Sequence, residues 1–128
     1  MSGILFLCIH NAGRSQMAAG FARELSNGDV VILSGGSEPA ATVNPVAVDV
    51  MNEIGIDIST YVPQKFNDDL LNAVDVVVTM GCGDTCPYIP GKRYVDWPLD
   101  DPKGKSIEDV RRIRDEIKSH VTDLLAQL

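Results

Sequence analysis

Three cysteines and one arginine are the residues of this chain whose types and spacing could carry chemistry. Cys8 stands alone, with five residues between it and Arg14, whereas Cys82 and Cys86 form a close pair. A thiolate is a nucleophile, and a guanidinium can bind an oxyanion through two parallel hydrogen bonds. The pattern predicts nucleophilic or redox chemistry rather than a disulfide scaffold, which normally uses a denser set of cysteines.

The segment between Cys8 and Arg14 predicts a cup for a tetrahedral oxyanion. Five residues can curl so that their backbone N–H groups point inward, and a helix that follows adds its positive N-terminal end. The same donors stabilise a thiolate at Cys8. Ser15 can hydrogen-bond the sulfur, and Asn11 can brace the loop. The predicted oxyanion-binding residues are Ile9, His10, Asn11, Ala12, Gly13, Arg14 and Ser15.

Hydrophobic patterning predicts the elements that hold this loop. Residues 4–8 form an apolar run without polar alternation, which is typical of a strand buried on both faces. Apolar residues at helical spacing predict a helix over 14–25, with Gly28 as its stop. A second strand is expected at 30–33 and should be closed by Ser34 to Ser37. Further strands are expected at 75–80 and 94–97, and further helices at 45–54, 68–72 and 106–125.

Strands that alternate with helices predict an α/β fold, an open parallel sheet of about four strands flanked by helices on both faces. The length of 128 residues suits one domain over residues 1–128. Ligands of such sheets bind beyond the carboxyl ends of the strands. The loops expected to converge there begin at Cys8, Ser34, Met80 and Trp97.

Composition excludes several partners. The formal net charge of −7 and the pI near 4.6 disfavour nucleic acid and anionic membrane surfaces, although a local site could still attract a small anion. Neither a secretory signal nor an apolar run long enough to cross a bilayer is expected, so the protein should be cytoplasmic.

Cys8 to Ser15 resembles the phosphate-binding loop of low-molecular-weight tyrosine phosphatases, and the resemblance extends over the whole chain. The Asp-Pro element that supplies that family's general acid corresponds to Asp101. The stretch from Arg14 to Met17 and the stretch from Thr79 to Pro87 are similar to the thioredoxin-coupled arsenate reductase branch. His10 departs from the family, which usually has a small residue there.

The resemblance implies a reduction of arsenate to arsenite through three thiols. Cys8 would form an adduct with arsenate, Cys82 would attack the Cys8 sulfur, and Cys86 would resolve the resulting disulfide. Asp101 would protonate the oxygen that leaves arsenic. No bound cofactor and no metal are expected. The reductant would be an external thiol, either thioredoxin or a low-molecular-weight thiol such as mycothiol.

Other functions remain open at this stage. Phosphomonoester hydrolysis would use the same Cys8, Arg14 and Asp101. A noncatalytic module could instead trap arsenite or zinc with its cysteines, with His10 and His120 assisting, although a closed zinc site normally needs four ligands. The cysteine pair could also be purely structural.

Two further residues, and a possible potassium site, are expected to have no functional role. His120 should lie on the surface of the C-terminal helix, and Trp97 should pack near the mouth of the sheet. No specific potassium site is expected. Asn11 and Ser34 match two potassium-ligand positions of some related reductases, whereas Ala19, Val62 and Gln64 stand where other ligands would be expected.

Overall fold

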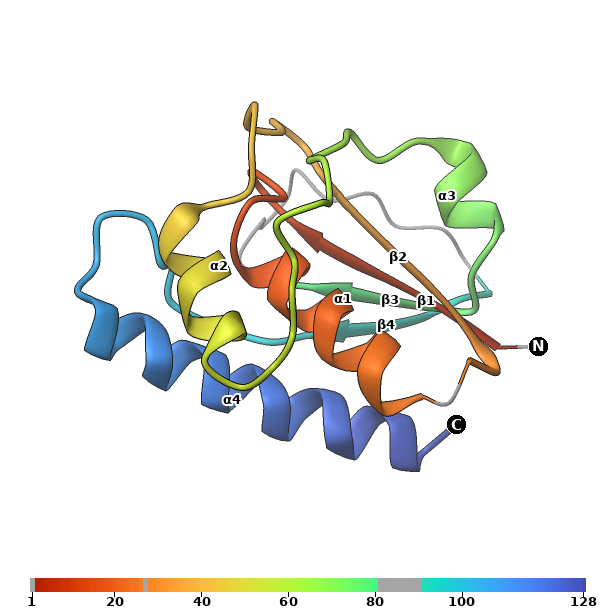
Figure 1. Cartoon of the computed structure of the whole chain (residues 1–128). Helices are drawn as coiled ribbons and strands as arrows, with labels where there is room; N and C mark the ends of the chain where they lie inside the picture. Colours follow the sequence, from red (N-terminus) through yellow and green to blue (C-terminus); the bar gives the residue numbers. More distant parts are fainter. Residues whose placement is uncertain (1, 27, 81–90) are drawn as a thin grey trace.

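The computed structural model describes residues 2–26, 28–80 and 91–128. Within these ranges the strands form one sheet in the order β2-β1-β3-β4, and every neighbouring pair is parallel (Figure 1). The predicted open parallel sheet is confirmed. The predicted thiol pair, Cys82 and Cys86, lies outside the described residues. The strands are β1 (Ser2–Cys8), β2 (Val30–Gly36), β3 (Val76–Thr79) and β4 (Arg93–Asp96).

Helices cover both faces of the sheet. One apolar cluster joins α1, α2 and α4 to one face and includes Phe6 and Phe21. On the opposite face, α3 contributes Leu71 to a smaller cluster with Leu5 and Leu7. The helices of the described chain are α1 (Arg14–Leu25), α2 (Pro45–Asn52), α3 (Asp68–Asn72) and α4 (Ile107–Ala126).

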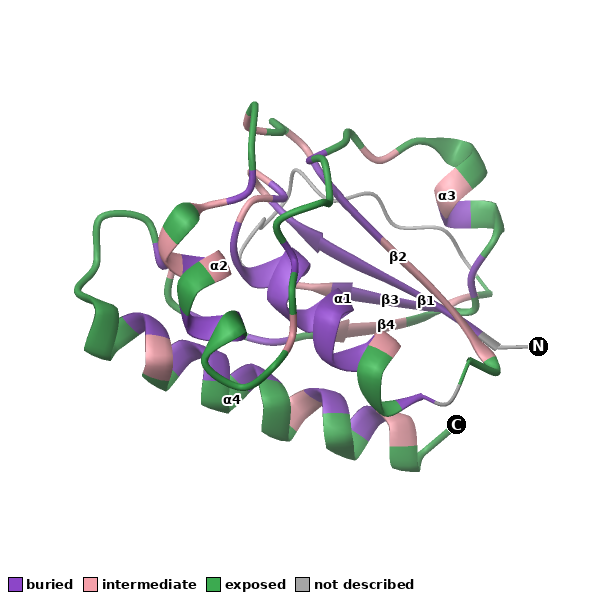
Figure 2. Cartoon of the chain, in the orientation of Figure 1, coloured by how far each residue is buried: buried purple, intermediate pink, exposed green. Residues whose placement is uncertain are grey.

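Strand β1 lies at the centre of this arrangement. Ile4 and Phe6 point to the larger cluster and Leu5 and Leu7 to the smaller one, and all four are fully buried (Figure 2). Strand order reverses beside β1, since β2 lies on one side of it and β3 on the other. An open α/β sheet binds its ligands at such a reversal, so the residue that ends β1, Cys8, lies at the expected position.

Several element boundaries differ from the sequence prediction by one to three residues, and the end of β2 differs most. Strand β2 continues through Gly36, which pairs with Cys8, instead of closing at Ser34. Glycine at position 36 lets the strand continue beside the cysteine loop, since a Cβ there would lie 2.5 Å from the Ile9 carbonyl oxygen. Helix α2 ends at Asn52, before the expected Ile54.

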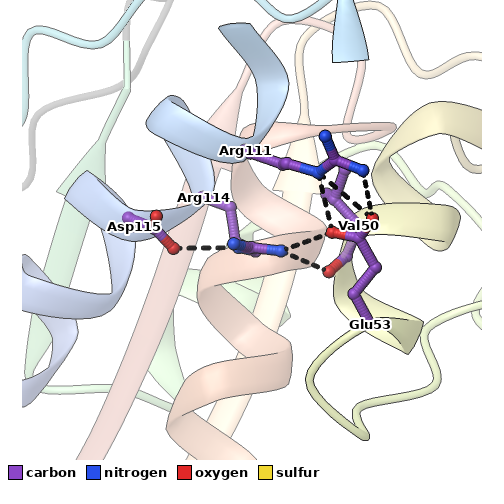
Figure 3. A network of polar contacts seen from close by, with 5 residues as sticks. All are labelled: Val50, Glu53, Arg111, Arg114 and Asp115. Carbon is purple, nitrogen blue, oxygen red and sulfur yellow. Dashed lines mark hydrogen bonds and ion pairs between the residues drawn. The ribbon is translucent and has the colours of Figure 1, made fainter. Parts of the chain in front are cut away.

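A polar network fastens the end of α2 to α4 (Figure 3). The nearly buried Arg114 donates to the Val50 carbonyl at 2.8 Å and to the Glu53 carboxylate at 2.9 Å. Arg111 binds the same carboxylate, with a shortest distance of 2.6 Å. The hydrogen bond from Arg111 is the largest cause of the lowered pKa of Glu53, and desolvation opposes it. The network holds α2, whose other end borders the pocket described below.

His120 differs from its sequence prediction. It is only partly exposed, and its ring stacks on Trp97 with the ring centroids 4.9 Å apart. Trp97 is buried as expected and also contacts Phe6. The His120 ring therefore covers the aromatic end of β4 instead of facing solvent freely. Of the helices in the described ranges, none is long and apolar enough to span a membrane.

Candidate functional site

Helix α1 begins differently from the other described helices. Its N-cap is Gly13, which makes no side-chain hydrogen bond to the first turn, and that turn holds no acidic residue. By contrast, α2, α3 and α4 are capped by the side chains of Asn44, Asn67 and Ser106. The first N–H groups of α1 therefore have no side-chain acceptor. Together with the positive end of the helix, they can bind an anion.

Ser15 connects the Cys8 thiol to the interior of the loop. Its Oγ lies 2.9 Å from the Cys8 Sγ and accepts a hydrogen bond from the Asn11 side chain at 2.7 Å. Because the oxygen already accepts from Asn11, its own hydrogen is available to donate to the sulfur. A donor in this position favours the thiolate form of a cysteine.

Asn11 shapes the loop through an unusual backbone conformation. Its φ is +50°, in the left-handed region that asparagine tolerates better than most residues, and its side chain is fully buried. Its Oδ1 accepts from the Gln64 backbone at 2.9 Å, and its carbonyl accepts from the Gln16 side chain at 3.1 Å. The Gln64 side chain in turn donates to the Ser34 carbonyl at 2.8 Å. The loop is therefore braced from three segments of the chain.

A pocket of about 230 Å³ opens over this loop. Arg14 lies in its wall and is almost completely buried. The pocket is large enough for a small tetrahedral anion. Its lining residues are Cys8, His10, Ala12, Gly13, Arg14, Ala40, Thr42, Val43, Asn44, Pro45, Asp101, Pro102 and Lys103.

Arg14 is only loosely engaged by protein groups. It donates to the Leu99 carbonyl at 3.4 Å, and its Nη2 lies 3.7 Å from the Asp101 carboxylate. Both distances are at the long limit for such contacts, so the guanidinium retains donors for a ligand. Asp101 lies on the rim, where its Oδ1 accepts from the Lys103 backbone at 3.0 Å. The carboxyl group thus combines a fixed orientation with access to solvent.

The loop that carries Asp101 touches the cysteine loop directly. A Cβ at Gly13 would lie 2.6 Å from Cγ of Pro102. Pro102 therefore packs against a stretch of backbone that has no side chain. This contact places the acidic turn beside the start of α1.

The residues of one wall of the pocket were not predicted from the sequence, although a loop beginning at Ser34 was expected near the mouth of the sheet. The segment 38–44 runs along the cysteine loop, and its backbone N–H groups donate to loop carbonyls. Glu38 donates to Ile9 and Asn44 donates to Ala12, both at 2.8 Å. Lys103 also lines the pocket without having been predicted. Neither the segment 38–44 nor Lys103 belongs to a recognisable sequence motif. The backbone hydrogen bonds of the segment leave no pattern of residue types in the sequence.

The local charge of the pocket opposes that of the whole chain. Among the described residues, Arg14 and Lys103 line it with a single carboxylate, Asp101, although the chain carries a net charge of −7. Two cations against one anion, with the positive end of α1, favour an anionic ligand.

The structure brings part of the predicted residue set together. The predicted residues that line the pocket are Cys8, His10, Ala12, Gly13, Arg14 and Asp101. Asn11 and Ser15 are buried among the loop contacts described above, and Ile9 accepts a hydrogen bond from Glu38.

The fold and the site define a class of protein. A cysteine at the end of the central parallel strand, an arginine at the start of the next helix and an acid on the rim line one pocket that could hold an oxyanion. The family model for low molecular weight phosphotyrosine protein phosphatases matches residues 3–128. The chain belongs to that family.

Similar proteins lie within the arsenate reductase branch. A putative arsenate reductase of Halobacterium salinarum is 44% identical over 124 residues, which cover 93% of this chain and 87% of that one. A glutaredoxin arsenate reductase of Synechocystis is 37% identical, with coverage of 100% and 99%. A solved thioredoxin-dependent arsenate reductase of Corynebacterium glutamicum is 38% identical, with a TM-score of 0.88 over 99% of this chain. This chain spans 61% of that Corynebacterium chain.

Proposed function

We propose that residues 1–128 form one catalytic domain that reduces arsenate to arsenite. The observation that carries the proposal is the pocket in which Cys8, Arg14 and Asp101 line one anion-sized space. The names of the similar proteins select arsenate among the tetrahedral oxyanions that such a pocket accepts.

In the proposed first step, the Cys8 thiolate attacks arsenic and an arsenate hydroxyl leaves as water after taking a proton from Asp101. The α1 N–H groups and the Arg14 fork hold the remaining oxygens. Support for these roles comes from the Ser15 hydroxyl beside the sulfur and from the position of Asp101 on the rim.

In the second step, the Cys82 thiolate attacks the Cys8 sulfur. A disulfide forms, the sulfur–arsenic bond breaks, and its electron pair leaves with arsenic, which is thereby reduced from As(V) to As(III). Cys86 then attacks Cys82, which frees Cys8 and leaves a Cys82–Cys86 disulfide for an external dithiol to reduce. This relay is proposed from the sequence and the family resemblance.

We further propose thioredoxin as the external reductant, because the relay ends in an intramolecular disulfide, which a dithiol protein reduces. The similar Corynebacterium protein is named for the same reductant. The Synechocystis relative is named for glutaredoxin, so a glutaredoxin or low-molecular-weight thiol system is the competing assignment.

The test compares arsenate turnover by the full chain with three reductant systems: thioredoxin with its reductase, glutaredoxin with glutathione, and mycothiol. Cys82→Ser should stop turnover with thioredoxin and leave weak hydrolysis of a small aryl phosphate intact, because water can resolve a phosphocysteine. Cys86→Ser should trap a Cys8–Cys82 disulfide, detectable by nonreducing peptide mapping after one exposure to arsenate.

Wild-type turnover in both variants would reject the intramolecular relay. Aryl phosphate hydrolysis without arsenate turnover in any reductant system would make the protein a phosphatase.

A further inference from the structure

His10 lines the pocket and has no role in the steps proposed above. Its ring lines the pocket beside Cys8 and Arg14 and is only partly exposed. Its Nδ1 lies 3.1 Å from the backbone carbonyl oxygen of Glu38.

The contact with Glu38 determines which nitrogen of His10 is available. A carbonyl oxygen can only accept a hydrogen bond, so Nδ1 carries the hydrogen in both the neutral and the protonated ring. Nε2 is therefore the ring nitrogen that is available to a ligand. Among residues 2–26, 28–80 and 91–128, Nε2 has no hydrogen-bond partner.

The backbone on both sides of the ring is also held in place. The Ile9 carbonyl accepts from the Glu38 N–H at 2.8 Å, and the His10 carbonyl accepts from the Ala40 N–H at 2.9 Å. With the Nδ1 contact, three hydrogen bonds join this turn to the opposite wall. The ring is therefore part of the wall of the pocket, with its orientation set before a ligand arrives.

We propose that Nε2 of His10 contacts the bound oxyanion and that the protonated ring adds a charged donor to those of α1 and Arg14. The inference rests on the proposed oxyanion site and deepens it by naming a residue that determines preference for anion charge. A protonated ring favours a dianion, whereas a neutral Nε2 accepts a hydrogen bond from an anion that still carries a hydroxyl.

Charged groups around the ring belong to several elements. Arg14 comes from α1, Asp101 and Lys103 come from the turn before α4, and Glu38 is in the opposite wall. Carboxyl, ammonium and guanidinium groups ordinarily titrate outside about pH 5.5 to 8, whereas imidazole titrates within that range. A thiol can also titrate there, so Cys8 has to be silenced in the test.

The experiment measures sulfate binding by titration calorimetry to the full chain carrying Cys8→Ser, at about pH 5.5 and about pH 8. Sulfate keeps two charges throughout, so the pH dependence reports the protein. We expect roughly tenfold tighter binding at the lower pH, the size of a charge-assisted hydrogen bond.

Two substitutions separate the ring nitrogens. His10→Asn keeps a donor for the Glu38 carbonyl and removes the Nε2 group, so it should bind sulfate weakly at both pH values. His10→Gln keeps a donor near Nε2 without titrating, so it should bind with intermediate affinity that does not change with pH.

Unchanged affinity and pH dependence in His10→Asn would overturn the proposal and leave His10 as a structural tie to Glu38. If the chain with His10 intact binds neither sulfate nor phosphate, the oxyanion site itself is wrong. That second outcome, together with absent arsenate turnover in the wild type, would reject the proposed function rather than the role of His10 alone.

Discussion

The two loops that meet at the pocket are built in opposite ways. In the cysteine loop, Cys8, Asn11 and Ser15 are at most 2% exposed and joined by hydrogen bonds to one another. In the acid loop, the side chain of Asp101 is 44% exposed and that of Asp100 is 63% exposed. Asp100 pairs at the surface with Arg112 at 3.3 Å.

The buried cysteine loop can hold its groups in place, whereas the exposed acid loop can adjust to a substrate. The cysteine loop is held by its own interior and by Gln16 and Gln64, so its N–H groups keep their directions without a ligand. The acid loop is held by a turn and a packed proline, so it can follow a substrate at little cost. A nucleophile needs the first design, and a group that must reach a leaving oxygen benefits from the second.

The largest expected effect is in the buried loop. Cys8→Ser should lower arsenate turnover by on the order of a thousandfold or more, because a hydroxyl is a far weaker nucleophile than a thiolate. The serine can keep the contact with Ser15, so urea unfolding should show a folded protein. Turnover within tenfold of wild type would remove Cys8 from the role of nucleophile.

The exposed loop should respond differently. Asp101→Asn removes the acidic proton but keeps an oxygen for the Lys103 N–H, so turnover should fall by about a hundredfold. The free energy of unfolding should change by less than about 0.5 kcal/mol, since the turn survives at the surface. Steady-state kinetics and urea unfolding of the same sample check both parts. A large loss of stability would contradict the contrast between the loops.

Substitution of Asn11, unlike that of Asp101, should cost a large part of the protein's stability. Asn11→Ala leaves Ser15 and the Gln64 N–H without their partner and puts alanine at φ +50°, which should cost roughly 2 kcal/mol or more of stability. Asn11→Gly removes the same hydrogen bonds but tolerates the backbone, so it should be destabilised less. Chemical denaturation of the pair separates the two causes. Equal stability of wild type and Asn11→Ala would refute the bracing role.

The smallest effect is expected away from both loops, at the network that joins α2 to α4. Arg111 lowers the pKa of Glu53, so the folded state holds its proton less tightly than the unfolded chain. The contribution to stability is present above the unfolded value and is lost as pH falls through the folded one. Glu53→Gln should therefore be less stable than wild type near pH 7, and the difference should shrink as pH falls below the ordinary pKa of glutamate and be lost below the lowered pKa of the folded state. A constant difference across this range, measured by urea unfolding, would exclude titration of Glu53 as its cause.

The sequence allowed much of the fold to be predicted, because burial leaves a regular trace in it. The apolar run of residues 4–8 identified the central strand, and apolar residues at helical spacing identified α1 and α4. The glycines at the end of β2 misled because a glycine pair serves a turn and a close backbone approach equally well. The stacking of His120 on Trp97 was missed because a helical pattern does not reveal what the partly exposed side packs against.

The site was predictable where its residues are consecutive and unpredictable where it depends on distant pairing. The spacing of Cys8 and Arg14 identified one wall. The wall formed by 38–44 joins through backbone N–H groups, which every residue except proline has. The role of Gln64 likewise depends on which segment lies behind Asn11, a fact of the fold rather than of local sequence.

The contact between Gly13 and Pro102 sets how closely the acid loop approaches the cysteine loop. Because the proline ring rests on bare backbone, the separation between the start of α1 and the acid's turn equals the minimum that two chains allow. A side chain at position 13 would overlap the proline ring, so either the ring or the turn that carries Asp101 would have to shift. The position of Asp101 relative to Cys8 therefore depends on glycine at position 13, and even a methyl group there would disturb it.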